Sequence, residues 1–167
     1  MKPIVIIGLS ALALAAGLTA SHAQAPPPPA RGPAMALAVE AAQTAIATCA
    51  ANGYKVSAVI VDSAGDTRVS LTADGASSMT AGFATRKAYT ANAMKEPSAQ
   101  VGEQAKTDTA LADRIKADPK MITWAGAQPL VVGGAVIGAI GVGGAPGGDK
   151  DDICTSAAIA RIKDRLK

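Results

Sequence analysis

The pattern of apolar and polar positions predicts a helix and then a β-hairpin at the start of the folded region. Residues 35–51 are alanine-rich and contain no glycine or proline, which is typical of a helix. Asn52-Gly53 ends this stretch, since glycine suits the left-handed position after a helix. Residues 56–61 form a largely β-branched run and residues 66–72 alternate between polar and apolar side chains, with the turn sequence Asp62-Ser63-Ala64-Gly65 between them.

Helical spacing returns in the middle of the chain. Apolar positions recur every three to four residues from residue 79 to about residue 95, and Pro97 ends that helix. Ser98 is expected to cap a shorter helix that runs to about residue 106. Residues 108–116 predict one or two further helical turns.

The last third of the chain predicts three short strands and a final helix. The strands are expected at residues 121–124, 129–132 and 135–142. Gly138 and Gly141 lie inside the last strand, which indicates a bulge or the close approach of another backbone or a ligand. The final helix is expected over residues 150–166, with Asp149 as its N-cap and Asp152 as the capping-box partner.

This order of elements predicts the fold class. Strands joined by hairpins and separated by helices indicate an α+β domain, with helices packed on an antiparallel sheet. Hydrophobic residues are 49% of the chain but aromatic residues only 2%, so small side chains must fill the core. Such a core is stable only if backbones approach closely or if subunits share buried surface. We therefore expect a homo-oligomer.

The N-terminal residues predict export. Lys2 precedes an apolar stretch over residues 4–18, which is too short for a comfortable membrane span, and Ser21-His22-Ala23 is a small-x-small cleavage site. An uncleaved anchor is the alternative. We expect a signal peptide at residues 1–23, a Pro-rich linker at 24–34 and one domain at 35–167. The mature protein is then periplasmic or secreted and has no stable membrane span.

Charge and histidine content exclude several functions. The net charge is +3, without a run of five like charges or a basic stripe with stacking aromatics, so a nucleic-acid partner is not expected. The only histidine, His22, lies in the predicted signal peptide. The mature chain is therefore expected to lack a Ser-His-Asp triad, a histidine-ligated zinc and a histidine-ligated heme. No metal site and no catalytic nucleophile with its base is apparent.

The two cysteines, Cys49 and Cys154, are about 105 residues apart and form no CxxC motif. In an exported protein a single disulfide between them is the leading interpretation, and two separate buried thiols are the alternative. Packing of the first and last helices on one face of the sheet brings the two cysteines together.

Several of these segments, taken in order, resemble the GlcG/HbpS-like family, also called the heme-degrading domain family. The resemblance covers about residues 36–165. It implies a profilin-like five-stranded antiparallel sheet flanked by helices, oligomers, and the binding of heme or a related tetrapyrrole. Some members act outside the cell in redox sensing, and others accompany glycolate or corrinoid metabolism. The matching segments are 53–54 through 61–65, 74–76, 85–91, 133–142 and 149–154.

The chain also departs from this family. Some relatives place a histidine near the iron, and the mature chain has none. Gly126-Ala127-Gln128-Pro129 stands where Gly-Gly before proline is common, and Gly143 stands where serine is frequent. The missing histidine argues against strong axial ligation of heme.

Five residues are candidates for ligand binding. Lys87 is suited to pair with a carboxylate such as a heme propionate, and Tyr89 to hydrogen-bond or to ligate ferric iron. Lys87 paired with Asp62 or Asp74 at the end of the hairpin is the structural alternative. A helical turn faces several directions, so Lys87, Tyr89 and Thr90 are not all expected to line one pocket. The full candidate set is Asp74, Gly75, Lys87, Tyr89 and Thr90.

Other candidate groups have simpler interpretations. Methionine is usually a core residue and not a ligand, and turn-forming aspartates are more common than cation sites. The glycines of residues 133–148 lack the spacing of a phosphate loop and are more typical of tight strand–helix packing. The methionines and aspartates concerned are Met79, Met94, Met121, Asp62, Asp66 and Asp74.

The leading hypothesis is an exported, self-associating module that binds heme or a related small ligand. The alternative is an enzyme or accessory factor in small hydroxy-acid or corrinoid metabolism, which needs Lys87 or Asp62 as a base. A structural protein without a small ligand is the third possibility.

Overall fold

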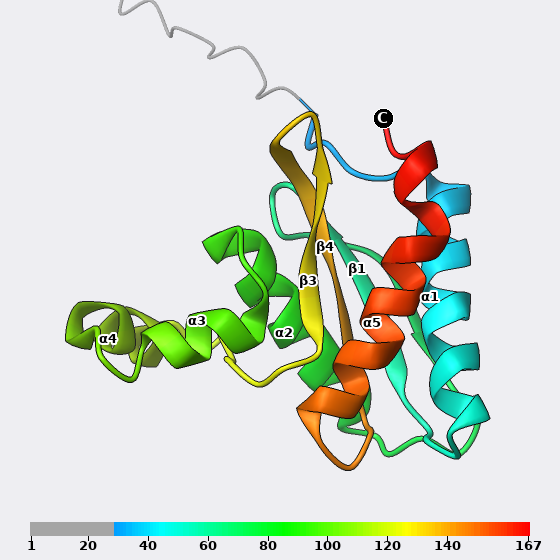
Figure 1. The fold of residues 1–167 in the computed structure, drawn as a ribbon, viewed down its shortest axis with the longest axis horizontal. Coiled ribbons are helices and arrows are strands. Elements are labelled where there is room, and N and C mark those ends of the chain that lie inside the picture. Colours follow the sequence, from blue (N-terminus) through cyan, green and yellow to red (C-terminus); the bar gives the residue numbers. More distant parts are fainter. Residues whose placement is uncertain (1–28) are drawn as a thin grey trace, which may run out of the picture.

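A computed structural model describes residues 29–167 of the chain. The predicted signal peptide at residues 1–23 and the first part of the predicted linker lie outside the described residues. Figure 1 shows a sheet with α1 and α5 side by side on one face and α2 on the other, while α3 and α4 extend away from it. The elements are α1 (Met35–Ala51), β1 (Ser57–Asp62), β2 (Thr67–Thr72), α2 (Thr80–Met94), α3 (Ser98–Gln104), α4 (Thr109–Ala117), β3 (Ala127–Val132), β4 (Ala135–Gly143) and α5 (Gly148–Ile162), followed by a 3-10 turn (Lys163–Arg165).

The predicted α+β class is confirmed, but the number of strands is not. The described residues form one four-stranded sheet in the order β2-β1-β4-β3, and every neighbouring pair is antiparallel. Ile60 on β1 sits between Val69 on β2 and Ile140 on β4. The prediction of five strands was wrong.

The strand expected at residues 121–124 is missing because side chains of α2 take up its backbone groups. The Ile122 amide donates to Thr90 Oγ1 over 2.9 Å, and the Met121 carbonyl accepts from Arg86 Nη2 over 2.9 Å. A β-ladder would need these same groups. The segment is therefore held against a helix and not against another strand.

The two faces of the sheet carry side chains of different size. The face under α1 and α5 packs larger residues such as Ile60, Leu130 and Ile140, against an alanine-rich surface of α1. The core between the other face and α2 is built from Val59, Val61 and five buried alanines, of which Ala84, Ala88 and Ala91 belong to α2 itself. The alternation along β1 is the period of two that separates the faces of a strand.

Glycine allows α2 to approach β4 very closely. A Cβ atom on Gly141 would lie within 2.8 Å of the Ala88 amide nitrogen and 3.0 Å of the Ala88 Cβ. This arrangement agrees with the expected strand–helix packing role of the glycines. It also explains how a core with few aromatic residues becomes close-packed.

The disulfide between Cys49 and Cys154 is confirmed. It joins the last turn of α1 to the first half of α5, with 5.6 Å between the Cα atoms. The expected capping box of α5 is wrong, because the helix begins at Gly148 with Gly147 as its N-cap residue. The nearby carboxylates of Asp151 and Asp152 bind other loops instead.

The described end of the predicted linker lies against the hairpin turn. The Ser63 amide donates to the Arg31 carbonyl over 2.8 Å, and the Arg31 amide donates to Ser63 Oγ over 2.8 Å. Between residues 29 and 167, no helix combines the length and the apolar character needed to cross a membrane.

Candidate functional site

A cleft of about 400 Å³ lies between the start of α2 and the loop that leads into α5. One wall is apolar and comes from Met79, Phe83 and Trp124. The opposite wall is the backbone of the glycine-rich loop at residues 144–148. We call this space the α2 cleft. Its volume falls within the range of small-molecule sites.

The apolar wall of the α2 cleft is exposed to solvent. Met79 is 62% exposed and Trp124 is 57% exposed. The rings of Phe83 and Trp124 pack with their centroids 5.3 Å apart, at an angle of 49°. Large apolar side chains that gather in one exposed cleft are typical of a ligand or partner site.

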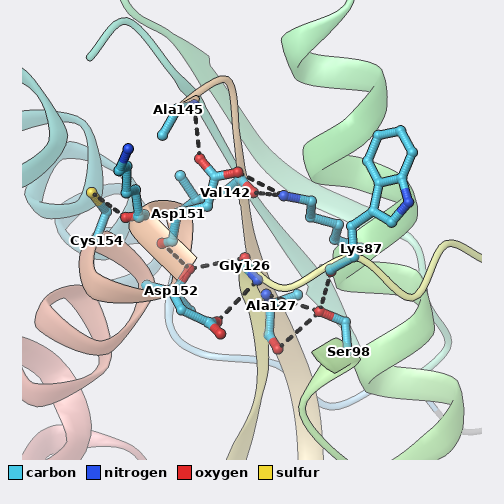
Figure 2. Close-up of polar contacts among 12 residues, drawn as sticks. Lys87, Ser98, Gly126, Ala127, Val142, Ala145, Asp151, Asp152 and Cys154 are labelled. Atoms are coloured by element: carbon cyan, nitrogen blue, oxygen red, sulfur yellow. Dashed lines mark hydrogen bonds and ion pairs between the residues drawn. The ribbon is translucent and has the colours of Figure 1, made fainter. Parts of the chain in front are cut away.

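A buried ion pair forms the polar part of the α2 cleft (Figure 2). Lys87 Nζ donates to Asp151 Oδ2 over 2.7 Å and to the Val142 carbonyl over 3.1 Å. Both charged side chains are only 3% exposed. The pair connects α2, β4 and α5, so it fixes the position of the cleft walls.

The acidic start of α5 holds the loops around the α2 cleft. Asp151 Oδ1 accepts from the Ala145 amide and Asp152 Oδ1 accepts from the Gly126 amide, each over 3.0 Å. Burial raises the pKa of Asp151 and of Asp152 above the ordinary value of 3.8, although the Lys87 ammonium opposes the shift in both.

The alternative prediction, that Lys87 forms a structural ion pair with an aspartate of the hairpin, was wrong about the partner. Lys87 pairs with Asp151 and not with Asp62 or Asp74. Asp62 Oδ1 instead accepts from the amides of Ala64 and Asp66, which is the pattern of a turn-forming aspartate. The sequence misled because Asp151 is 64 residues from Lys87.

Tyr89 and Thr90 do not line the α2 cleft. Tyr89 donates its hydroxyl to Asp118 Oδ2 over 3.1 Å, and this hydrogen bond is the main reason that its pKa is raised above 10.0. Ligation of ferric iron needs the phenolate, so the raised pKa disfavours that role. Thr90 is fully buried and accepts the Ile122 amide.

Asp74 and Gly75 also lie apart from the α2 cleft. Asp74 lines a different hollow of about 530 Å³, together with Tyr54 and Lys55. Gly75 packs beside the Lys55 side chain, since a Cβ atom there would be 2.9 Å from its Nζ. Of the five candidate residues, the structure places only Lys87 in the α2 cleft.

No cluster of three or more histidine, cysteine or acidic side chains suited to a metal ion occurs among residues 29–167. Of the thioether candidates, Met79 lies on the rim of the α2 cleft and Met121 is only 5% exposed.

The residues of the α2 cleft fit the ring of heme better than a strongly ligated iron. The rings of Phe83 and Trp124 offer apolar aromatic surface against which a macrocycle can pack. Lys87 is already bound to two acceptors, so it is not free to bind iron. Met79 is the lining side chain with a soft donor atom that is open to a ligand, and methionine sulfur is a known heme ligand.

Sequence reasoning missed Trp124, Asp151 and the glycine-rich loop as parts of this site. Trp124 is the only tryptophan of the chain, and its isolation was the one available signal. The approach of the loop to α2 depends on the sheet topology, which no local pattern encodes.

The chain matches a known protein family and several solved structures. The family model described as "Haem degrading protein HbpS-like" matches residues 34–160. No curated protein matches the chain. Among solved structures, that of HbpS is 33% identical with a TM-score of 0.71, and the match covers 77% of this chain and 89% of that one.

Two further structures extend the likeness. A double mutant of HbpS from Streptomyces reticuli is 33% identical with a TM-score of 0.72, and covers 83% of this chain and 98% of its own. A complex titled PduOC:Heme is 24% identical with a TM-score of 0.72, over 80% of this chain and 96% of that one. The latter identity supports the fold alone.

Proposed function

Because the chain belongs to the HbpS-like family of heme-degrading proteins, we propose that it binds heme or a related flat tetrapyrrole in the α2 cleft. The observation that carries this proposal is the exposed wall of Met79, Phe83 and Trp124 beside a buried Lys87–Asp151 pair. PduOC, which shares the fold, forms a complex with heme, and the match to the heme-degrading family model supports this ligand class.

Each part of the α2 cleft has a separate role in this proposal. The rings of Phe83 and Trp124 would pack against the macrocycle, and Met79 would be the side chain that holds the iron. The glycine-rich loop leaves room because glycine carries no side chain. Bound heme would supply redox chemistry, while the chain supplies the shape of the cleft and excludes water from one ring face.

Binding is better supported than turnover by the same residues. Lys87 Nζ donates to Asp151 and to the Val142 carbonyl, so its nitrogen is engaged in two structural hydrogen bonds. Asp62 is occupied by two backbone amides. The two bases that a hydroxy-acid reaction would need are therefore engaged in structural contacts.

We further propose that the domain acts outside the inner membrane as an oligomer. Helix α4 buries none of its residues in the described chain, although Leu111 and Ile115 lie on one side of it at helical spacing. Val131 and Ile153 add exposed apolar surface, at 48% and 60% exposure. A second copy of the chain would cover such surfaces.

Titration of the purified mature protein with hemin tests the proposal. Trp124 is the only tryptophan, so quenching of its fluorescence reports a ligand in the α2 cleft. We expect saturable quenching together with a Soret shift at micromolar hemin. The Met79→Ala variant should keep the quenching but lose the spectrum of thioether-ligated iron.

The matched control is Met35→Ala, which removes an exposed methionine of α1 outside the α2 cleft. It should leave both signals unchanged. A Soret shift without any quenching of Trp124 would place heme elsewhere and contradict the proposed site.

A further inference from the structure

A third cavity, of about 460 Å³, shares no residue with the α2 cleft or with the hollow that Asp74 lines. We call it the hairpin cavity. It is lined by the β1–β2 turn at residues 64–67, by Arg86 and Tyr89 of α2, and by Pro119-Lys120. Three chain segments far apart in sequence therefore converge on one space that the proposed heme site does not use.

The hairpin cavity carries cations without matching carboxylates. In the described part of the chain, no acidic side chain lies within 4.0 Å of the charged nitrogens of Arg86 or Lys120. Asp66 is the only acidic residue that lines the cavity there. Asp118 lies close by, but its carboxylate accepts from the Tyr89 hydroxyl and the Lys120 amide. The carboxylates of Asp66 and Asp118 are therefore nearby but not in contact with the Arg86 guanidinium, which leaves this cation open to an anionic ligand.

Arg86 is only partly satisfied within the protein. Its Nη2 donates to the Met121 carbonyl over 2.9 Å. Its Nε is buried and has no hydrogen-bond partner in the described structure. Buried donors are nearly always paired, and an oxygen that reaches this guanidinium edge would supply the missing acceptor. The planar guanidinium is also the group best matched to a carboxylate.

The rest of the hairpin cavity is suited to a flat or apolar body. The ring of Tyr89 forms one side, and Pro119 adds apolar surface. Gly65 has a φ of +86°, and a Cβ atom there would lie 3.2 Å from the Tyr89 ring. The hairpin turn therefore packs against the ring at Gly65, and Lys120 Nζ lies 5.6 Å from the ring centroid.

We propose that the hairpin cavity binds a small organic carboxylate with a flat body, whose carboxylate lies between Arg86 and Lys120 and whose body packs on the Tyr89 ring. This site is separate from the α2 cleft. Its occupation does not depend on heme binding.

Proton–nitrogen NMR titration of the full mature protein with benzoate tests this inference. The buried Arg86 Nε–H and the Gly65 amide report the cavity, and the Trp124 indole N–H reports the α2 cleft. We expect saturable shifts at Arg86 and Gly65 without a shift at Trp124. Inorganic phosphate serves as the probe for a general anion site, and acetate as the probe for a carboxylate without a flat body.

Three variants test whether benzoate binds through the cations of the hairpin cavity. Lys120 is exposed, so Lys120→Gln should fold normally and weaken benzoate binding about two- to fivefold, the effect of an exposed charge pair. Arg86→Gln should abolish binding, while Lys116→Gln on α4 is the matched control and should bind as the unchanged protein does. The absence of saturable shifts, equal binding by phosphate, or equal affinity of Lys120→Gln and Lys116→Gln would each overturn the inference.

Discussion

At the scale of single residues, the Lys87–Asp151 pair decides how firmly the α2 cleft is held. Two opposite charges, each 3% exposed, lose most of their hydration on folding, and direct contact compensates for that loss. Neither residue stabilises the protein when its partner is absent. The pair therefore fixes geometry more than it adds net stability.

Removal of one partner alone should be costly. We expect Lys87→Met and Asp151→Asn each to lower the free energy of unfolding by about 3 to 5 kcal/mol, because each leaves a buried charge unpaired. The double variant should cost clearly less than the sum, which urea unfolding of the four proteins would measure. Lys106→Met removes an ion pair whose lysine side chain is 67% exposed and is the control, with an expected loss below about 1 kcal/mol. Additive losses would contradict this account.

The half-buried carboxylate of Asp152 gives stability a defined pH dependence. Burial raises its pKa above 3.8, so the folded protein holds this proton more tightly than the unfolded chain does. The protonated Asp152 side chain therefore stabilises the folded state fully below pH 3.8. This stabilisation is lost as the pH rises through the raised pKa of Asp152 in the folded protein.

Asp152→Asn should therefore gain stability relative to the unchanged protein as the pH rises above 3.8. Unfolding curves at several pH values would measure this difference. Asp149→Asn changes an exposed carboxylate of the same helix and is the matched control. If Asp152→Asn instead loses stability relative to the unchanged protein as the pH rises, folding does not favour the protonated form of Asp152.

Residue patterns predicted Lys87 as a site residue but not its partner. The helical spacing of residues 79–95 placed Lys87 on a helix, and its chemistry suggested an acidic partner. The choice of Asp151 depends on α5 returning beside β4, which is a property of the whole sheet. Long-range pairing of this kind leaves no local trace in a single sequence.

At the scale of elements, the contact between α2 and β4 shapes the α2 cleft. Glycine and alanine on both sides let the helix lie almost on the strand, as at Gly141 and Ala88. The same helix carries Phe83 and Lys87 into the cleft. A change in the helix–strand distance therefore changes the ligand site.

Gly141→Ala tests this coupling. The added methyl group would contact the backbone of α2, so we expect a loss of about 1 to 3 kcal/mol in the free energy of unfolding and weaker hemin binding. Gly82→Ala is the matched control, because a Cβ atom there meets nothing within 4 Å. If Gly141→Ala behaves like Gly82→Ala in both assays, α2 is not packed as described.

The regular helices and hairpins were predictable because their signals are local. The alanine-rich first helix and the hairpin at residues 57–72 appear where the pattern places them. The segment at residues 121–124 was not predictable, because its apolar side chains suit a strand as well as they suit a loop packed on a helix. Arg86 and Thr90 of a distant helix take its backbone groups. Competition between partners far along the chain decides such a segment.

At the scale of the whole molecule, the disulfide joins the two helices that close the fold. Cys49 and Cys154 lie 105 residues apart, so the bond closes most of the domain into one loop. In the chain-entropy model, closing so long a loop stabilises the folded state by about 4 to 5 kcal/mol.

Reduction should therefore weaken the protein markedly without altering the α2 cleft. We expect the Cys49→Ala, Cys154→Ala double variant to lose about 4 to 5 kcal/mol in the free energy of unfolding and to retain hemin binding where it is folded. Reductant should have no effect on this variant, which serves as its own control. Stability that is equal with and without reductant in the unchanged protein would contradict the structural role of the bond.

Crystals of the hemin complex, measured by anomalous scattering at the iron absorption edge, give the most direct test of the proposed heme site. We expect one iron peak per chain inside the α2 cleft, beside Met79 and the Phe83–Trp124 pair. A peak at any other surface, or hemin-soaked crystals without a peak, would contradict it.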